Sequence, residues 1–132
     1  LCIFPSTDGS VVDTAKIPPR YFQYSPEWLG MFPRVLSRYV KEEGLMTVEE
    51  AIRRMTSYAC QRLRIFDRGI IRAGMWADLT IFNFETIKAR GDFDNPQQHP
   101  EGIEYVLVNG KLVVEKGEYS RIQEGKVLRH RA

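Results

Sequence analysis

The sequence is poor in the side chains from which metal and nucleophilic sites are usually built. Its 132 residues include two histidines, His99 and His130, and two cysteines, Cys2 and Cys60. A catalytic zinc site takes about three protein ligands from His, Cys and carboxylate groups, and neither histidine has a second His or a Cys at ligand spacing. The histidines therefore predict no metal site within this chain. Each cysteine is expected to be a small buried apolar residue rather than half of a disulfide.

The sequence also lacks membrane-span, signal-peptide and common catalytic motifs, and each absence argues against a class of function. No apolar run approaches the length of a membrane span and no signal-peptide pattern occurs, which predicts a cytoplasmic protein. The net charge is +2 with both signs interspersed, so no nucleic-acid or membrane partner is expected. There is no Gly-x-Ser-x-Gly motif, no histidine placed to activate a nucleophile, and no glycine-rich phosphate loop. A hydrophobic content of 43% and a charged content of 27% indicate a globular protein of one domain or two partial ones.

The chain opens on an apolar run that ends near a carboxylate. Residues 1–4 are all apolar, which favours a strand buried on both faces of a parallel sheet. Asp8 follows just past this strand, where α/β folds carry their catalytic groups. Asp8-Gly9 is also an ordinary turn dipeptide, and the residues alone leave both interpretations open. Because a buried parallel strand needs neighbours on both edges, we expect the chain to be a piece of a larger protein.

Two helices are predicted after a long irregular connection over residues 9–31. The first begins near Phe32, with Pro33 at its first position and Gly44 at its end. Its apolar stripe holds Val35, Leu36, Tyr39 and Val40. The second begins at a capping box formed by Thr47 and Glu50 and runs to about Ala59.

The second half of the chain has the pattern of short strands. Strands are expected at residues 70–71, 78–83, 103–108, 111–115 and 127–128. Asn109-Gly110 separates two of them and favours a two-residue type I′ hairpin. Lys116-Gly117 closes the second strand of that hairpin. The hairpin strands need a further layer to bury Ile103, Tyr105 and Leu107.

Several motifs together resemble the C-terminal portion of N-acyl-D-amino-acid deacylases (D-aminoacylases) of the amidohydrolase superfamily. Ser6-Thr7-Asp8-Gly9 is followed by Pro19-Arg20 and then by residues 30–40, which contain Phe-Pro-Arg-Val-Leu-Ser-Arg-Tyr-Val. Residues 47–57, 67–79 and 104–110 complete the set, so the resemblance covers nearly the whole chain. The Gly-x-x-x-x-Gly-x-x-Ala-Asp-Leu stretch and the Val-Asn-Gly hairpin indicate only the superfamily. The Phe-Pro-Arg run after an Asp-Gly indicates the deacylases.

The resemblance implies a fold class, a reaction and two site residues. The expected class is α/β. Residues 1–66 would be the last strand and helices of a metal-dependent-hydrolase (β/α)8 barrel, and residues 67–132 the C-terminal part of a small β-sandwich. The implied enzyme uses zinc to hydrolyse an N-acyl-D-amino acid to a carboxylate and a D-amino acid. Asp8 matches the family's general base at the metal centre, whereas the other metal ligands belong upstream of this chain.

One residue departs from the family pattern and leaves the substrate contact open. Family members usually read His-Pro-Arg in the loop after the aspartate, and this chain reads Pro18-Pro19-Arg20. Arg20 is a candidate for pairing with a substrate carboxylate, and a structural salt bridge is an equal alternative. The same residues leave two other functions open: another amidohydrolase such as a hydantoinase, or a stand-alone interaction module. As an enzyme piece without metal ligands, the chain alone is expected to be inactive.

Overall fold

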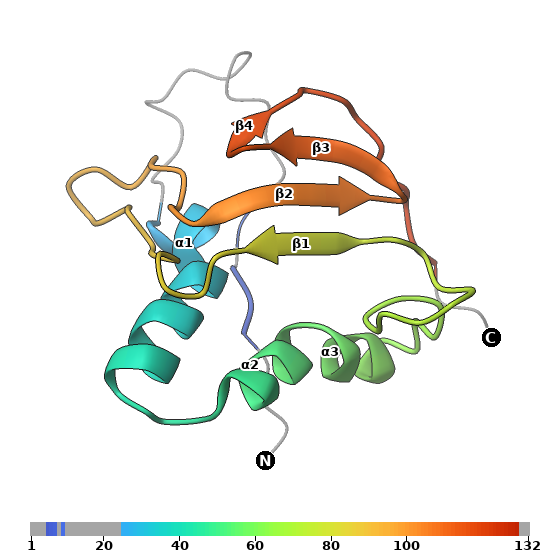
Figure 1. Ribbon diagram of the computed structural model, residues 1–132, viewed down its shortest axis with the longest axis horizontal. Helices are drawn as coiled ribbons and strands as arrows, with labels where there is room; N and C mark the ends of the chain where they lie inside the picture. The colour runs from blue at the N-terminus through green and yellow to red at the C-terminus, as the bar shows by residue number, and fades with distance from the viewer. Residues whose placement is uncertain (1–4, 8, 10–24, 130–132) are drawn as a thin grey trace.

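Figure 1 shows the computed structural model, which describes residues 5–7, 9 and 25–129. Within these residues the helical segments come first and a four-stranded antiparallel sheet follows. The helical segments are α1 (Glu27–Arg34), the π-helix η2 (Val35–Glu42), α2 (Val48–Met55) and α3 (Ser57–Arg62). The strands are β1 (Leu79–Phe82), β2 (Ile103–Val108), β3 (Lys111–Glu115) and β4 (Glu118–Tyr119). None of the helices in this part of the chain is long and apolar enough to cross a membrane.

The first helix begins earlier than the sequence predicts. α1 starts at Glu27, so Pro33 lies inside the helix rather than at its first position, and the prediction of an irregular connection is wrong for residues 27–31. Pro26 occupies the N-cap, and the Ser25 hydroxyl oxygen accepts the Glu27 N–H at 3.3 Å. An interior proline removes one helical hydrogen bond, and directly beyond it the chain continues in the wider π-helical turns of η2. The remainder of the predicted connection, residues 10–24, lies outside the described residues.

The predicted capping box is half confirmed. The Thr47 hydroxyl oxygen accepts the Glu50 N–H at 3.3 Å, as predicted. The Glu50 carboxylate does not return to the cap, because Arg53 and Arg54 donate to it at 2.8 and 2.6 Å. The helix that follows also stops short of Ala59. Thr56 has φ −128° and ψ −94°, which are not helical values, so the predicted helix is interrupted there and divides into α2 and α3.

The sheet is a meander in the order β1-β2-β3-β4, with tight turns between its last three strands. The β2–β3 hairpin has the predicted bounds, and Asn109 and Gly110 have φ values of 51° and 81°, as a type I′ turn requires. Lys116 and Gly117, at 50° and 81°, make a second turn of this kind between β3 and β4. The strands predicted at residues 70–71 and 127–128 are wrong: both segments are irregular, and Ile71 and Val127 are more than 80% exposed.

The core lies where the helices meet the β1 edge of the sheet (Figure 1). Val35 and Leu36 of η2 and Ala51 of α2 are buried together with Ile87, which comes from the segment between β1 and β2. Phe82 and Ile103, at the ends of β1 and β2, pack against this cluster. The predicted apolar stripe of the first helix is confirmed, since Val35 and Leu36 are its buried members. Ile103, Tyr105 and Leu107 of β2 are half-buried in the described part of the chain.

Candidate functional site

The two predicted site residues, Asp8 and Arg20, lie outside the described residues, but the neighbours of Asp8 do not. The Gly9 N–H donates to the Thr7 hydroxyl oxygen at 3.3 Å. A Cβ atom added to Gly9 would lie 3.4 Å from Cγ of Trp28 and 3.2 Å from the Thr7 hydroxyl oxygen. The backbone next to Asp8 therefore packs directly on Trp28 of α1.

The helix that carries Trp28 is fixed from its other side by the segment leading into β2. The Arg34 Nη2 group donates to the Gly91 carbonyl oxygen at 3.1 Å. Side chains have no room here: a Cβ on Gly91 would lie 2.7 Å from the Pro96 carbonyl oxygen and 3.5 Å from Cβ of Pro26. A Cβ added to Gly30 would lie 3.2 Å from the Cβ of Ala89, also a tight approach. Pro26, Gly30 and Arg34 are four residues apart, so one face of α1 makes all three contacts.

A second cation extends this attachment along η2. Lys41 Nζ donates to the carbonyl oxygens of Phe84 and Glu85, at 3.1 and 2.6 Å, and lies 5.5 Å from the centre of the Phe84 ring. Arg34 and Lys41 thus bind the backbone of the segment between β1 and β2 at two points. Together they hold the helical segments that follow Asp8 against the sheet.

The described residues do not by themselves provide a metal site. No group of three or more His, Cys, Asp or Glu side chains that could hold a metal ion occurs among them. His99 is exposed on the segment before β2, and His130 is outside the described range. Cys60 is half-buried rather than fully buried, and burial raises the pKa of its thiol above the usual value, which disfavours the thiolate that binds metals.

A polar cluster around one buried arginine joins three residues that are distant in the sequence. Arg68, which is 9% exposed, donates to Oδ2 of Asp78 and, at 2.6 Å, to Oδ1 of Asn109. The other Asp78 oxygen, Oδ1, accepts the backbone N–H of Asn109 at 2.7 Å. The Asn109 side-chain amide donates to the Glu124 carbonyl oxygen at 2.5 Å. The cluster therefore ties the turn after α3, the start of β1, the β2–β3 turn and the C-terminal segment together.

Sequence reasoning missed this cluster although its residues stood in the quoted motifs. Arg68 and Asp78 belong to the Gly-x-x-x-x-Gly-x-x-Ala-Asp-Leu region and Asn109 to the Val-Asn-Gly hairpin. The signal available in the sequence was that these motifs carry one cation, Arg68, and one carboxylate, Asp78, that could pair. In the structure Arg68, Asp78 and Asn109 form one hydrogen-bonded unit.

Comparison with known proteins agrees with these motifs. Residues 23–114 match the sequence model of the amidohydrolase family, and this span is more than half of the chain. The chain belongs to the amidohydrolase family. The superfamily predicted from the motifs is thereby confirmed.

Individual relatives narrow the resemblance to the deacylases. The chain is 39% identical over 107 residues to the N-acyl-D-glutamate deacylase of Alcaligenes xylosoxydans xylosoxydans, which covers 81% of this chain and 22% of the relative. A D-aminoacylase structure, from work on its binuclear metal centre, matches with a TM-score of 0.78 and 33% identity over 80% of this chain and 22% of its own. The resemblance to N-acyl-D-amino-acid deacylases is confirmed. The chain spans about a fifth of the length of these relatives.

A third relative shows which metal such a protein can contain. The structure of the N-acyl-D-glutamate deacylase from Bordetella bronchiseptica, complexed with zinc and a phosphonate inhibitor, matches with a TM-score of 0.66 and 42% identity. The match covers 67% of this chain and 19% of that one. Both of these solved relatives are thus described with a metal, a binuclear centre in the D-aminoacylase and zinc in the Bordetella enzyme.

Proposed function

We propose that the chain is the C-terminal part of a zinc-dependent amidohydrolase that cleaves N-acyl-D-amino acids to a carboxylate and a D-amino acid. The observation that carries this proposal is the match of about 80% of the chain to deacylases that all act on this class of amide. The remainder of the active enzyme, and most of its metal ligands, would come from the four-fifths of the relatives' length that this chain does not span.

The chain's own division supports the expected architecture. Under the proposal, residues 1–66 hold the last strand and helices of a (β/α)8 barrel, and residues 67–132 hold the C-terminal share of a β-sandwich. Among the described residues the helices lie between Glu27 and Arg62, and the strands begin only at Leu79. An active-site carboxylate at the end of a barrel strand is the usual placement in such folds.

In this proposal Asp8 is the catalytic base. Its carboxylate accepts a proton from the attacking water and then donates it to the leaving nitrogen of the amide. A base of this kind must be held within hydrogen-bond reach of both atoms. Support comes from the Gly9 backbone, which packs on Trp28 of a helix that is itself fixed to residues 89–91.

Arg20 and the metal complete the proposed site. Arg20 would pair with the α-carboxylate of the substrate, for which a guanidinium is suited because it donates two parallel hydrogen bonds. Zinc is proposed because the Bordetella relative contains it. Since the described residues include no ligand set, Asp8 is the one candidate contact to the metal that we assign to this chain.

Activity of the full-length protein towards an enantiomeric substrate panel tests the proposal. We expect release of the amine from N-acetyl-D-glutamate, N-acetyl-D-aspartate or N-acetyl-D-methionine, and none from the L-enantiomers. Asp8→Ala should lower turnover by about 10²–10⁴-fold, as expected for the loss of a general base. Its zinc content, measured by atomic absorption, should stay close to that of the wild type. Asp8→Asn removes the charge but keeps the side chain's size, so it separates loss of the carboxylate from loss of volume.

Three results would contradict the proposal. Turnover of a hydantoin in place of every N-acyl-D-amino acid would assign the protein to the alternative amidohydrolase activity. Wild-type turnover in Asp8→Ala would return Asp8 to the role of a turn residue. Hydrolysis by residues 1–132 alone would show that the missing ligands are not needed.

A further inference from the structure

Gly9, the residue bonded to Asp8, lies against the side chain of Trp28. A Cβ atom placed on Gly9 would be 3.4 Å from Cγ and 3.6 Å from Cβ of Trp28. Atoms at such distances are in van der Waals contact, so no further atom fits between the two residues. Because the chain spans about a fifth of the length of its relatives, a longer protein packs more residues around it. Those residues can cover this contact but cannot enter it.

The position of Gly9 limits where the α-carbon of Asp8 can lie. Successive Cα atoms are about 3.8 Å apart across a trans peptide unit, and that unit is planar. On the other side of Asp8, the Thr7 hydroxyl oxygen accepts the Gly9 N–H at 3.3 Å. The residues before and after Asp8 are therefore hydrogen-bonded to each other, and Trp28 supports this short unit from α1.

Trp28 is a firm support because the helix that carries it is closely packed. The Pro26 side chain is less than 2% exposed and Gly30 is buried. A Cβ on Gly30 would lie 3.2 Å from Cβ of Ala89, so α1 has no free space on that side. Adding more chain can only increase burial of this kind. The attachment of α1 to residues 89–91 is thus a property of the whole protein as well.

We propose that Trp28 is a positioning residue for Asp8. It holds the Gly9 backbone so that the Asp8 carboxylate stays in reach of the attacking water. The inference rests on the proposed function, since it takes Asp8 to be the base. A base must lie within about 2.6–3.2 Å of the atom whose proton it removes, and a misplacement of about 1 Å can lower the rate about 10²-fold. Because Trp28 acts through Asp8 and not on the substrate, its loss lowers kcat and leaves KM unchanged.

Steady-state kinetics of the full-length zinc enzyme test this role, with the N-acetyl-D-amino acid that the wild type hydrolyses as substrate. Trp28→Ala should lower kcat about 10–100-fold and change KM less than about twofold. Trp28→Phe keeps Cβ and Cγ, the two atoms nearest to Gly9. Its kcat should therefore stay within about threefold of the wild-type value.

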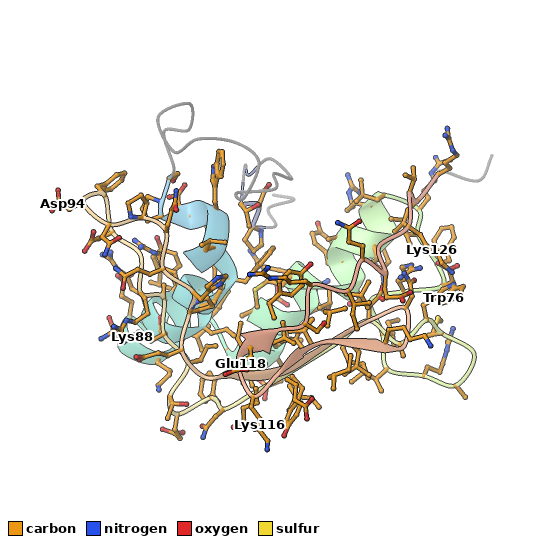
Figure 2. The ribbon with its side chains drawn as sticks, turned by 90° about the horizontal axis from the view of Figure 1, so that it is seen from above. Trp76, Lys88, Asp94, Lys116, Glu118 and Lys126 are labelled. Atoms are coloured by element: carbon orange, nitrogen blue, oxygen red, sulfur yellow. The ribbon has the colours of Figure 1, made fainter. Side chains whose placement is uncertain are left out.

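Trp76→Ala is the matched control, because it makes the same substitution far from α1. Figure 2 shows Trp76 and Lys126 at one end of the molecule, whereas Lys88 and Asp94, on either side of the residues that α1 contacts, lie at the other. Trp76→Ala removes the ring that lies beside Arg68 and Lys126. It should lower the Tm without changing kcat.

A second pair of variants moves α1 without altering Trp28. Gly30→Ala places a Cβ 3.2 Å from Cβ of Ala89, so the two segments must separate by a few tenths of an ångström. We expect kcat to fall by about twofold to fivefold. Alanine is favoured over glycine inside a helix, so this loss would not reflect an unstable α1. Ala89→Gly removes the opposing methyl group, and the double variant Gly30→Ala/Ala89→Gly should recover the wild-type kcat.

Four results would overturn the inference. In the Trp28 variants these are a wild-type kcat in Trp28→Ala, an equal loss of kcat in Trp28→Phe, and a rise in KM alone. If Trp28→Ala does not fold, the exchange between residues 30 and 89 decides: Gly30→Ala with the wild-type kcat, or a double variant that does not recover, is the fourth. A wild-type protein that hydrolyses no N-acyl-D-amino acid would overturn the proposed function, and this inference with it, before any variant is compared.

Discussion

The cluster of the buried Arg68 with Asp78 and Asn109 makes a quantitative prediction about stability. Asp78→Asn keeps the shape of the side chain and an oxygen for the Asn109 N–H, but it leaves the guanidinium of Arg68, which is 9% exposed, without its anion. Breaking a buried ion pair from one side costs about 3–5 kcal/mol. Asp78 is 33% exposed, so water can partly replace its charge, and we expect a loss nearer about 2 kcal/mol.

Thermal unfolding followed by circular dichroism measures this loss. For the 132-residue chain on its own, about 2 kcal/mol corresponds to a fall in Tm of about 8 °C. Glu101→Gln is the matched control, because its partner Arg90 and Glu101 itself are each about half exposed, and exposed pairs contribute less than about 1 kcal/mol. The double variant Arg68→Met/Asp78→Asn should be more stable than Asp78→Asn, since no buried charge is left unpaired. If Asp78→Asn lowers the Tm no further than Glu101→Gln does, the reasoning about burial is wrong.

Two further predictions concern the start of α2. Hydrogen bonds from Arg53 and then Arg54 lower the pKa of Glu50 from its usual 4.5 to about 2, so its stabilising effect is complete above pH about 4.5 and is lost as the pH falls towards about 2. The Tm difference between wild type and Glu50→Gln should therefore shrink over this range, and a difference that stays constant with pH contradicts the pairing. Thr47→Ala removes the acceptor for the Glu50 N–H and should cost about 1 kcal/mol, read from urea unfolding. Thr47→Ser keeps that acceptor and should unfold like the wild type; equal losses in both variants would exclude the cap.

The elements predicted well from sequence are those whose signals are local. Asn109-Gly110 determines its own turn, because both residues tolerate positive φ and the flanking strands are β-rich, so the hairpin bounds are correct to the residue. Thr47 likewise signals the start of α2 through a hydroxyl three residues from its partner. Such features require no knowledge of what packs against them.

The errors arise where distant residues decide the structure. Pro33 was expected at a helix start, yet α1 runs through it, since the face formed by Pro26, Gly30 and Arg34 docks onto residues 89–91. Ile70 and Ile71 are β-branched, but in the part of the chain that the structure describes the sheet ends at β1 and they pair with no strand. The Arg68–Asp78–Asn109 cluster spans 41 residues and no spacing rule reveals it.

For the candidate site, the sequence supplied the residues and the resemblance supplied their roles. Asp8 carries no local signal beyond a strand end and a turn, because a catalytic carboxylate is defined by partners that come from elsewhere. Its roles and that of Arg20 stay predictions. What the structure adds is the immediate support of Asp8: the Gly9 backbone, Trp28 and the helix behind them.

The attachment of α1 and η2 to the segment between β1 and β2 has a consequence for building hybrid enzymes. Val35, Leu36 and Ala51 precede residue 66, and Ile87 follows it, yet the four form one buried cluster. Arg34 and Lys41 also precede residue 66, and they donate hydrogen bonds to Gly91, Phe84 and Glu85, which follow it. A chimaera that exchanges everything after residue 66 with a related deacylase would therefore separate Ile87 from the other three residues of the core cluster. It would also separate Arg34 and Lys41 from the backbone groups to which they donate. A crossover that moves residues 27–103 together keeps these contacts intact.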